Sequence, residues 1–345
     1  MTSYDQLLVS LEAPSPLRQA LALRTAIGLE ALSDIFVATT DDRFERCAED
    51  EQLAPIRLFP RVRRKRSDVL MVHAGPGLDT VVDLIGGLAK HIVLVHHAHT
   101  CPAVREAERS LLPVVDRVIA PTPFEAADAV ALGADRALVA MPPLTWGHVA
   151  PDQADPVLSE RLSKGRQVVV AVGDPVPGSR LEDVVAAVAI AQLDYPLDVD
   201  IVVFGAGDPV YEASLARWAK QLGLVGRLVL AGDQSMSERT AWLRWAAMVV
   251  SFSASGGLDL DLMDAMTVGI PIIARDFGHT RDQLAGGGLL LPADTGPTLV
   301  AEAIGQLWID PDLRVEVAMS GHIGFGEALL AHAASPLLPA LEGLG

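Results

Sequence analysis

The sequence predicts an α/β protein with two domains, each built on a parallel sheet. Short runs of Val, Ile and Leu recur along the 345 residues, and segments with apolar residues at helical spacing separate these runs. Half of the residues are hydrophobic, and a chain of this length can bury two cores. Continuous apolar strands that alternate with helices are typical of a parallel sheet that is covered on both faces.

The first domain is expected over residues 1–144. Its predicted strands, which are rich in β-branched residues, are 6–11, 34–38, 55–58, 68–73, 91–96 and 117–120. The predicted helices, which place alanine and leucine on one face, are 17–32, 78–88 and 123–132. A polar, proline-bearing linker over 145–165 follows.

The second domain is expected over 166–322, with a final helical segment over 323–345. Its predicted strands are 167–173, 199–204, 228–232, 248–250 and 271–274. Its predicted helices are 181–193, 211–222, 237–246, a short one within 258–268, and 298–309; a last helix is expected over 324–341.

Composition excludes several classes of protein. The net charge of −17 argues against general binding of nucleic acids, and two cysteines give no disulfide framework. No apolar run has the length of a membrane span, and the first residues lack a signal-peptide pattern. We therefore expect a cytoplasmic protein.

A local basic cluster departs from this acidic composition. It contains Arg61, Arg63, Arg64, Lys65 and Arg66. Such a cluster can contact anionic lipid headgroups, as at the edge of a membrane, or a phosphorylated acceptor. The alternative is a solvated loop between two strands.

The stretch 253–282 is the most informative part of the chain. Gly256 and Gly257 follow a buried strand, a short amphipathic helix comes next, and Gly269 ends it before the strand 271–274. A glycine turn that leads into a helix N-terminus is a ready anion site, because unpaired N–H groups and the helix dipole point at the ligand.

This stretch resembles the donor-binding segment of GT-B-type retaining glycosyltransferases, the group 1 or family 4-like enzymes that use sugar nucleotides. The matching residues are Ser253, Gly257, Leu260, Ala265, Met266, Gly269, Pro271, Ile273, Ala274 and Gly278. The resemblance implies two Rossmann-like domains whose parallel sheets face each other across a cleft. It also implies transfer of a hexose from a UDP-, GDP- or ADP-linked sugar to a small or lipid acceptor. No cofactor is implied as required, and Mg²⁺ is left open.

The donor motif is degenerate at several positions. The first glutamate of the family falls on Gly256, its Phe-Gly pair on Leu258 and Asp259, and its second, ribose-contacting glutamate on Asp264. The second glycine of a later Gly-Gly pair falls on His279.

The loop after the first strand of the second domain also departs from the family. The family has an arginine after Gly173 and a lysine five residues further on, where this chain has Asp174 and Ser179. Arg180 is placed to take over the phosphate-binding role.

Histidines end two strands of the first domain, where ligands bind to parallel sheets. They are His73, His96, His97 and His99. The family has a functional histidine after the strand that corresponds to 93–95, which makes His97 and His99 the catalytic candidates, together with Asp264. Satisfied surface histidines are the simpler interpretation, and a metal site of His97, His99 and Cys101 is a third one.

Three functions remain open at this point. The first is hexosyl transfer. The second is a catalytically inactive relative that supports a partner glycosyltransferase or binds a glycan, which the loss of the arginine, the lysine and the first glutamate favours. The third is a related enzyme that uses His97, His99 and His279 on a different anionic ligand.

Overall fold

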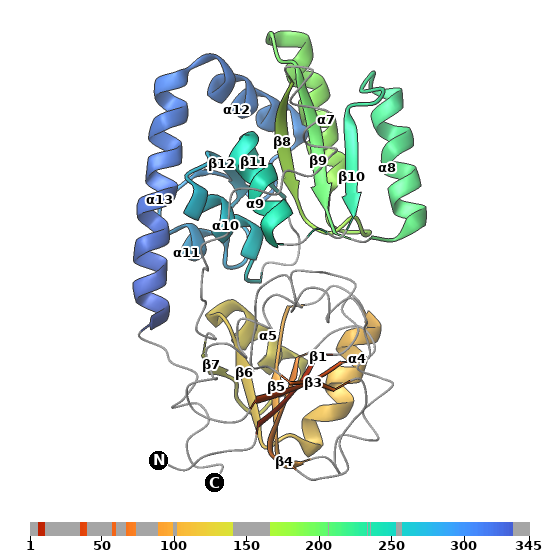
Figure 1. Ribbon diagram of the computed structural model, residues 1–345, viewed down its shortest axis with the longest axis vertical. Coiled ribbons are helices and arrows are strands. Elements are labelled where there is room, and N and C mark those ends of the chain that lie inside the picture. Colours follow the sequence, from red (N-terminus) through yellow and green to blue (C-terminus); the bar gives the residue numbers. More distant parts are fainter. Residues whose placement is uncertain are drawn as a thin grey trace. The chain divides into compact units, whose positions relative to one another are not determined.

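The computed structural model describes residues 6–10, 35–39, 57–59, 67–73, 89–98, 102–140, 166–205, 207–232, 234, 236–252 and 257–333. The chain divides into two compact units, Met1–Gly147 with Ala331–Gly345, and His148–Leu330. Each described unit contains one parallel β-sheet with helices packed on it (Figure 1). Within the described part of the chain, no helix combines the length and the apolar composition that crossing a bilayer requires.

The sheet of the first unit has the order β3-β2-β1-β4-β5-β6-β7. Its strands are β1 (Gln6–Ser10), β2 (Ile35–Thr39), β3 (Arg57–Phe59), β4 (Ser67–His73), β5 (Ala89–Val95), β6 (Arg117–Ala120) and β7 (Leu138–Val139). The helical elements are α4 (Pro102–Leu111), the 3-10 turn η2 (Leu112–Val114) and α5 (Pro123–Leu132). The predicted strands are confirmed to within three residues at each end, whereas the helices predicted over 17–32 and 78–88 lie outside the described residues.

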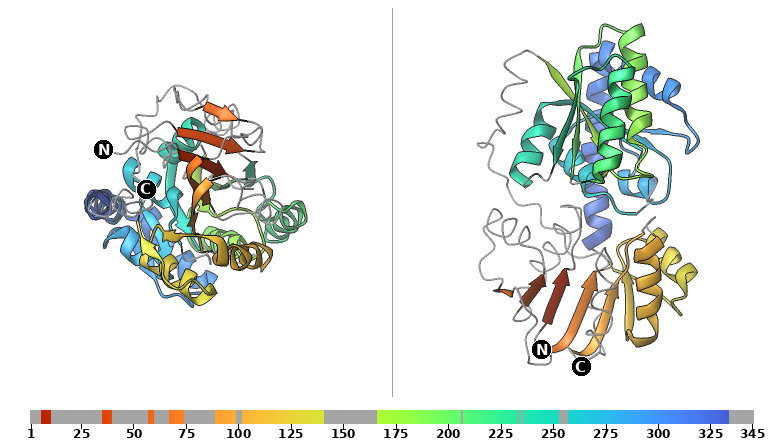
Figure 2. Two further views of the ribbon diagram at one scale, coloured as in Figure 1. Left: turned by 90° about the horizontal axis from the view of Figure 1, so that it is seen from below. Right: turned by 90° about the vertical axis from the view of Figure 1, so that its right-hand side faces the viewer.

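The sheet of the second unit has the order β10-β9-β8-β11-β12-β13. Its strands are β8 (Gln167–Val172), β9 (Val199–Phe204), β10 (Leu228–Gly232), β11 (Ala246–Ser251), β12 (Ile272–Arg275) and β13 (Leu289–Leu291). The helices are α7 (Leu181–Asp194), α8 (Pro209–Gln221), α9 (Met236–Trp245), α10 (Leu260–Val268), α11 (Thr280–Leu284), α12 (Pro297–Ile309) and α13 (Pro311–Ala333). Figure 2 shows the strands of this sheet running between layers of helices.

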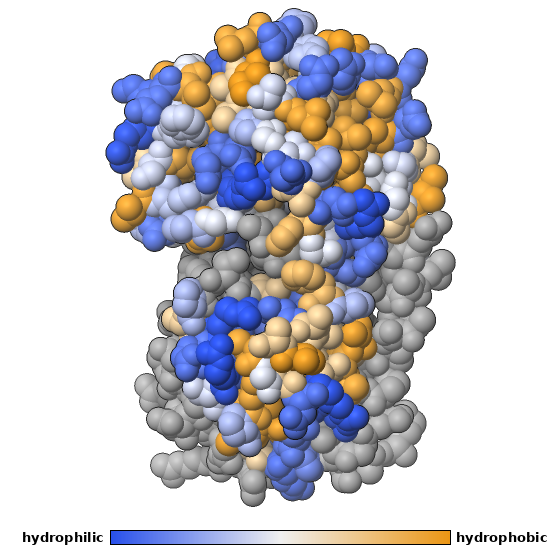
Figure 3. Space-filling model, turned by 180° about the vertical axis from the view of Figure 1, so that it is seen from behind, coloured by the Kyte–Doolittle hydropathy of each residue, from blue (hydrophilic) through white to orange (hydrophobic). Residues whose placement is uncertain are grey.

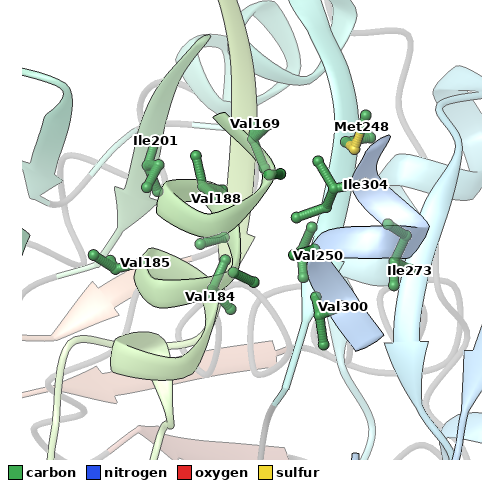
Figure 4. Close-up of a cluster of buried hydrophobic side chains, with 14 of the residues drawn as sticks. Val169, Val184, Val185, Val188, Ile201, Met248, Val250, Ile273, Val300 and Ile304 are labelled. Atoms are coloured by element: carbon green, nitrogen blue, oxygen red, sulfur yellow. The ribbon is translucent and has the colours of Figure 1, made fainter. Parts of the chain in front are cut away.

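Side chains of the central strand β8 alternate between the two faces of the second sheet. Val169 and Ala171 pack with α7 and α12, and Val168, Val170 and Val172 pack with α9 and α10. Figure 4 shows valines of α7, Val169 and Ile304 of α12 in one apolar cluster. Both faces are therefore buried, which explains the continuous apolar sequence of these strands.

The surface of the second unit carries separate apolar side chains as well as charged ones. Figure 3 shows hydrophobic residues between hydrophilic ones on the face that it displays. Leu193 and Val210 are among the exposed residues, at 84% and 76% of their full area. Isolated exposure of this kind is ordinary for a folded surface.

The last helix differs from the prediction, because α13 begins at Pro311 rather than near residue 324. The Asp310 carboxylate accepts a hydrogen bond from the Leu313 N–H at 2.9 Å, and Pro311 occupies the first helical position. Within this helix, Gly324 allows a close approach of backbones. A Cβ on Gly324 would lie 2.3 Å from the Leu284 carbonyl oxygen, so only glycine fits there.

Helix α4 was not predicted at all. The sequence around Pro102 suggested only that the strand before it stops. Its apolar face is formed by Val104, Ala107 and Leu111, which are buried on the first sheet. Charged residues lie between them in the sequence, so the helical spacing of the apolar residues was not recognised.

Candidate functional site

The loop between β8 and α7 is held in a tight conformation at the carboxyl end of the sheet. Gly173 has a φ of 129°, which favours glycine, and Val176 N–H donates to the Asp174 carbonyl at 2.8 Å. Ser179 N–H then donates to the Val176 carbonyl at 3.1 Å. The loop therefore returns the chain to the start of α7, where Arg180 occupies the N-cap position.

Asp174 packs against the turn that follows β9. A Cβ on Gly205, whose φ is 94°, would lie 2.5 Å from Asp174 Oδ1. A Cβ on Gly207 would lie 2.1 Å from the Pro175 carbonyl oxygen. Glycines in this turn thus allow the loop after β8 to sit directly on the neighbouring strand end.

Arg180 adopts a left-handed backbone conformation, with φ 59° and ψ 29°. Its guanidinium contacts the Asp183 carboxylate through Nε at 2.7 Å and Nη2 at 2.5 Å. The side chain is 39% exposed. Arg180 is therefore a cation that the N-terminus of α7 presents to solvent or to a ligand.

A second arginine, which the sequence analysis missed, lies beside Arg180. Arg275 ends β12, is buried, and places its guanidinium over the Phe252 ring at 4.4 Å. It donates to the Thr295 carbonyl and lies 3.6 Å from Asp183 Oδ2. Burial, and then the charge of Arg180, lower the pKa of Arg275. In the sequence, only the position of Arg275 at the end of a strand indicated a functional role for it.

Helix α10 follows Gly257 by three residues, and Gly256 lies outside the described residues. Gly257 and Leu258 are half-buried. Asp259 caps α10, because its Oδ1 accepts hydrogen bonds from Asp261 N–H at 3.0 Å and Leu262 N–H at 3.4 Å. This carboxylate therefore occupies two of the N–H groups that a ligand anion at the start of α10 would use.

The charge of Asp259 is disfavoured by its surroundings. Desolvation is the main cause that raises its pKa, to about 7. The Leu262 hydrogen bond and the charge of Arg239 lower the pKa, and the charges of Asp174 and Asp264 raise it. Three of the carboxylates that were expected at this end of the sheet thus interact electrostatically.

Arg239 on α9 is the second cation that the sequence analysis missed. It is buried, forms an ion pair with Asp261, and lies over the Phe204 ring at 5.4 Å. Asp264 is also buried, on the same short helix as Asp261. Nothing in the sequence near Arg239 marked it, because it comes from a helix that is distant from the motif along the chain.

His279 stands at the N-cap position of α11 and is buried. Its Nδ1 lies 3.6 Å from Asp282 Oδ2. Most of the predicted donor-site residues belong to loops and helix starts after β8, β11 and β12, namely Gly173, Asp174, Arg180, Gly257, Leu258, Asp259 and His279, whereas Asp264 lies in the middle of α10. That placement agrees with the carboxyl-end rule for open parallel sheets.

In the first unit, the two adjacent histidines after β5 take part in different networks. His96 is fully buried and contacts Glu108 Oε1 through Nδ1 at 2.8 Å and Asp128 Oδ2 through Nε2 at 3.0 Å. Arg105 also donates to Asp128, at 2.8 Å. Burial opposes the charge of His96, but the hydrogen bonds and charges of Glu108 and Asp128 outweigh it and raise its pKa.

His97 contacts a third histidine instead. Its Nε2 lies 3.2 Å from Nδ1 of His73, the last residue of β4, and its Nδ1 lies 3.7 Å from Glu125 Oε1. His73, His97 and Glu125 are all buried. His99 and Cys101 lie outside the described residues, as does the basic cluster Arg61, Arg63, Arg64, Lys65 and Arg66.

Among the described residues, no group of three or more histidine, cysteine or acidic side chains is placed to hold a metal ion. The carboxylates at the second sheet instead face Arg180, Arg239 and Arg275. The arrangement is suited to an anion that can share these guanidinium groups with the carboxylates.

Comparisons with known proteins agree with this placement. Residues 166–310 match the family model described as Glycosyl transferases group 1. A solved structure of HepE from Anabaena in complex with UDP-glucose is similar, with 14% identity, a TM-score of 0.75, and 98% of this chain and 99% of that chain covered. Among curated protein sequences, none matches the chain significantly.

Two further solved structures share the fold. Sucrose-phosphate synthase from Thermosynechococcus elongatus has 16% identity and a TM-score of 0.69, with 99% of this chain and 100% of that chain covered. WaaG, a glycosyltransferase involved in lipopolysaccharide biosynthesis, has 14% identity and a TM-score of 0.67, with 97% and 98% covered.

The chain thus has the GT-B fold, with two parallel-sheet α/β units. Residues 166–310 of its second unit match the group 1 glycosyltransferase model, which agrees with the resemblance found in the sequence. The comparisons do not favour the alternative of an inactive scaffold or glycan-binding protein.

Proposed function

We propose that the protein is a glycosyltransferase that moves a hexose from a nucleotide-sugar to a hydroxyl group of a small or lipid acceptor. The observation that carries this proposal is the group 1 match over residues 166–310, in which two arginines meet at the start of α7. HepE, which shares the fold, has been solved with UDP-glucose, and this supports a nucleotide-sugar as the donor.

Arg180 and Arg275 are proposed to bind the diphosphate. A diphosphate needs cations or N–H donors, and the cations of the family motif are replaced here by Asp174 and Ser179. Arg180 and Arg275 share Asp183, so a phosphate that approaches the N-terminus of α7 gains two guanidinium partners. Because Arg180 is partly exposed, it can turn from Asp183 to a ligand.

The start of α10 is proposed to hold the rest of the donor. Asp264 takes the ribose-contacting position of the family, and Gly257 and Leu258 place backbone close to the sugar. Asp259 has a pKa of about 7, so it can take up a proton when an anion arrives and thereby relieve repulsion. His279 adds a bulky polar group at the family's glycine position.

The chemistry that this arrangement serves is the departure of a nucleotide diphosphate. The bond between the anomeric carbon and the phosphate oxygen breaks, and negative charge grows on the diphosphate. Fixed guanidinium groups stabilise that charge most strongly where burial has removed water, as it has around Arg275. On the acceptor side, His97 and His99 are the histidines proposed to support transfer.

A binding screen tests the proposal. The full chain is heated with UDP-, GDP- and ADP-linked sugars, with and without Mg²⁺, and the melting temperature is followed. We expect one nucleotide class to raise it, and Arg180→Ala to abolish the shift. Arg217→Ala, which removes an exposed arginine of α8, is the matched control and should keep the shift. The absence of a shift with every donor, together with no hydrolysis of any donor, would refute the proposal.

A further inference from the structure

A cavity lies at the amino end of the second sheet, away from the candidate donor site. Its volume is about 590 Å³, which is within the range of small-molecule sites. Its walls come from the residue before β8, the end of α9, the start of β11, the turn before β12 and the start of α13. Strand β8 has six residues, so on the order of 17 Å separates the cavity from the loop that carries Asp174.

Three arginines from different parts of the chain line this cavity. Arg166 directly precedes β8, Arg244 lies in the last turn of α9, and Arg314 is the fourth residue of α13. None of the lining residues that the structure describes is acidic. The whole chain has 44 acidic and 27 basic residues, so a cavity that gathers only cations departs from its composition.

The charges of two of these arginines are not used by ion pairs. Arg166 contacts Asp200 at 3.5 Å, and Arg227 contacts the same carboxylate oxygen at 3.4 Å. Arg244 and Arg314, in contrast, form no salt bridge with any residue in the described part of the chain. Their guanidinium groups are therefore available to an anion.

Helix stability explains the position of only one of these two arginines. A cation at the C-terminus of a helix is stabilised by the helix dipole, and Arg244 has that position in α9. Arg314 lies near the N-terminus of α13, where the dipole disfavours a cation. A residue that opposes a local preference in this way indicates a role outside its own helix.

An exposed indole lies beside the arginines. Trp245 is the last residue of α9, lines the cavity, and is 57% exposed. The wall around it contains the small residues Ala246, Ala247, Gly269 and Ala318. No atom lies within 4 Å of a Cβ built on Gly269, so this part of the wall faces open space. The cavity therefore combines room for a ring with an aromatic face on which a ring can stack.

We infer that this cavity binds a phosphate ester of a ring compound, such as a nucleoside phosphate or a sugar phosphate. The phosphate accepts hydrogen bonds from Arg244 and Arg314, because two guanidinium groups without ion pairs match the charge of a phosphate monoester near pH 7. The ring packs on Trp245. This site does not depend on the proposed glycosyl transfer, because none of its residues belongs to the donor site.

The first experiment follows Trp245 directly. The five tryptophans of the full-length protein are labelled with ¹⁵N at the indole nitrogen, and Trp245→Phe identifies the Trp245 signal. Uridine 5′-phosphate, adenosine 5′-phosphate and glucose 6-phosphate are then titrated, beside inorganic phosphate and the same compounds without phosphate. We expect at least one ester to give a saturable shift of the Trp245 signal, and the ester that binds identifies nucleotides or sugars as the source.

Inorganic phosphate and the compounds without phosphate should bind at least tenfold more weakly than that ester, because each makes only one of the two contacts. The absence of a Trp245 shift with every ester would overturn the inference. Equal affinity for inorganic phosphate and for the ester would also overturn it, because the ring would then contribute nothing.

The second experiment measures the affinity of the same ester by isothermal titration. Arg244→Gln and Arg314→Gln should each weaken binding about tenfold through the loss of a charge-assisted contact. Trp245→Leu should weaken it about tenfold through the loss of stacking. Arg217→Gln, at an exposed position on α8, is the matched control and should bind like the parent. Parental affinity in a double Arg244→Gln, Arg314→Gln variant with an unchanged melting temperature would overturn the inference.

A third comparison separates this site from the proposed donor site. Arg180→Ala should keep the Trp245 shift, and Arg244→Gln should keep the rise in melting temperature that the nucleotide-sugar gives. If Arg180→Ala abolishes the Trp245 shift and the two glutamine variants keep it, the ester binds at the carboxyl end of the sheet and the inference is wrong. If no nucleotide-sugar binds but the Trp245 shift follows Arg244 and Arg314, the proposed transfer fails and this site stands.

Discussion

Arg275 and Arg180 approach the same carboxylate oxygen, Oδ2 of Asp183, at 3.6 and 2.7 Å. Two guanidinium groups therefore share one carboxylate at the N-terminus of α7, where the helix dipole adds to their positive charge. Asp294 is a further carboxylate whose charge acts on Arg275.

Arg275→Gln should weaken the binding of the preferred nucleotide diphosphate about tenfold, because one charge-assisted contact is lost. Isothermal titration gives the affinity. Arg217→Gln on α8 carries the same change of charge outside the site and should bind like the parent. Equal affinity in a folded Arg275→Gln protein would remove Arg275 from the phosphate site.

The pKa of Asp259 predicts a pH-dependent free energy of unfolding. The folded pKa of about 7 is above the ordinary value of 3.8, so the native state binds the proton more tightly. The stabilisation is fully present below pH 3.8 and is lost as the pH rises through 7, with a slope of at most about 1.4 kcal/mol per pH unit.

Asp259→Asn should reduce the slope of the free energy of unfolding against pH, since asparagine keeps the helix cap without a charge. Urea unfolding between pH 5 and pH 8 measures the difference. Asp135→Asn, at an exposed position in the first unit, should leave the slope as it was. A slope that is the same in all three proteins would show that Asp259 ionises normally.

His96→Ala should destabilise the protein by about 3 kcal/mol, because Glu108 would remain as a buried charge without its partner. The folded pKa of His96 is raised, so its contribution is fully present below pH 6.5 and is lost as the pH rises through the folded value. The penalty measured by urea unfolding should therefore be larger at pH 6 than at pH 9. His91→Ala, on the half-exposed side of β5, should show a much smaller effect.

Gly324→Ala should destabilise the second unit by about 1–3 kcal/mol, because the new methyl group would meet the Leu284 carbonyl. Gly326→Ala in the same helix has nothing within 4 Å of the added carbon and should stabilise by up to about 1 kcal/mol. Thermal unfolding of both variants checks the opposite signs. Equal effects would mean that helix propensity alone determines the stability of both variants, and that α13 does not pack closely on the end of α11.

Most strands of both sheets could be predicted from the sequence because each is a compact apolar run, whereas the short edge strands β7 and β13 were not predicted. Strand β6 and helix α5 were predicted with their observed bounds, since Thr122-Pro123 and Gly133 mark the two ends of that helix. Helix α13 was placed too late, because it begins at Pro311, directly after α12.

Candidate site residues that directly follow a strand could be predicted from the sequence, whereas those that join the site through packing could not. Asp174, Arg180 and Asp259 follow strands of the second sheet or cap the next helix, as expected. Arg239 comes from α9, and its pairing with Asp261 depends on tertiary contact that no spacing reveals. His73 was noted at a strand end, but its hydrogen bond to His97 links two strands and required coordinates.

Two histidines at the ends of the neighbouring strands β4 and β5 have opposite acid–base behaviour. His96 keeps its proton between carboxylates, whereas the ring of His73 that contacts His97 resists protonation. Charge and neutrality are thus favoured on two imidazoles of the same sheet edge, each by the groups packed around it.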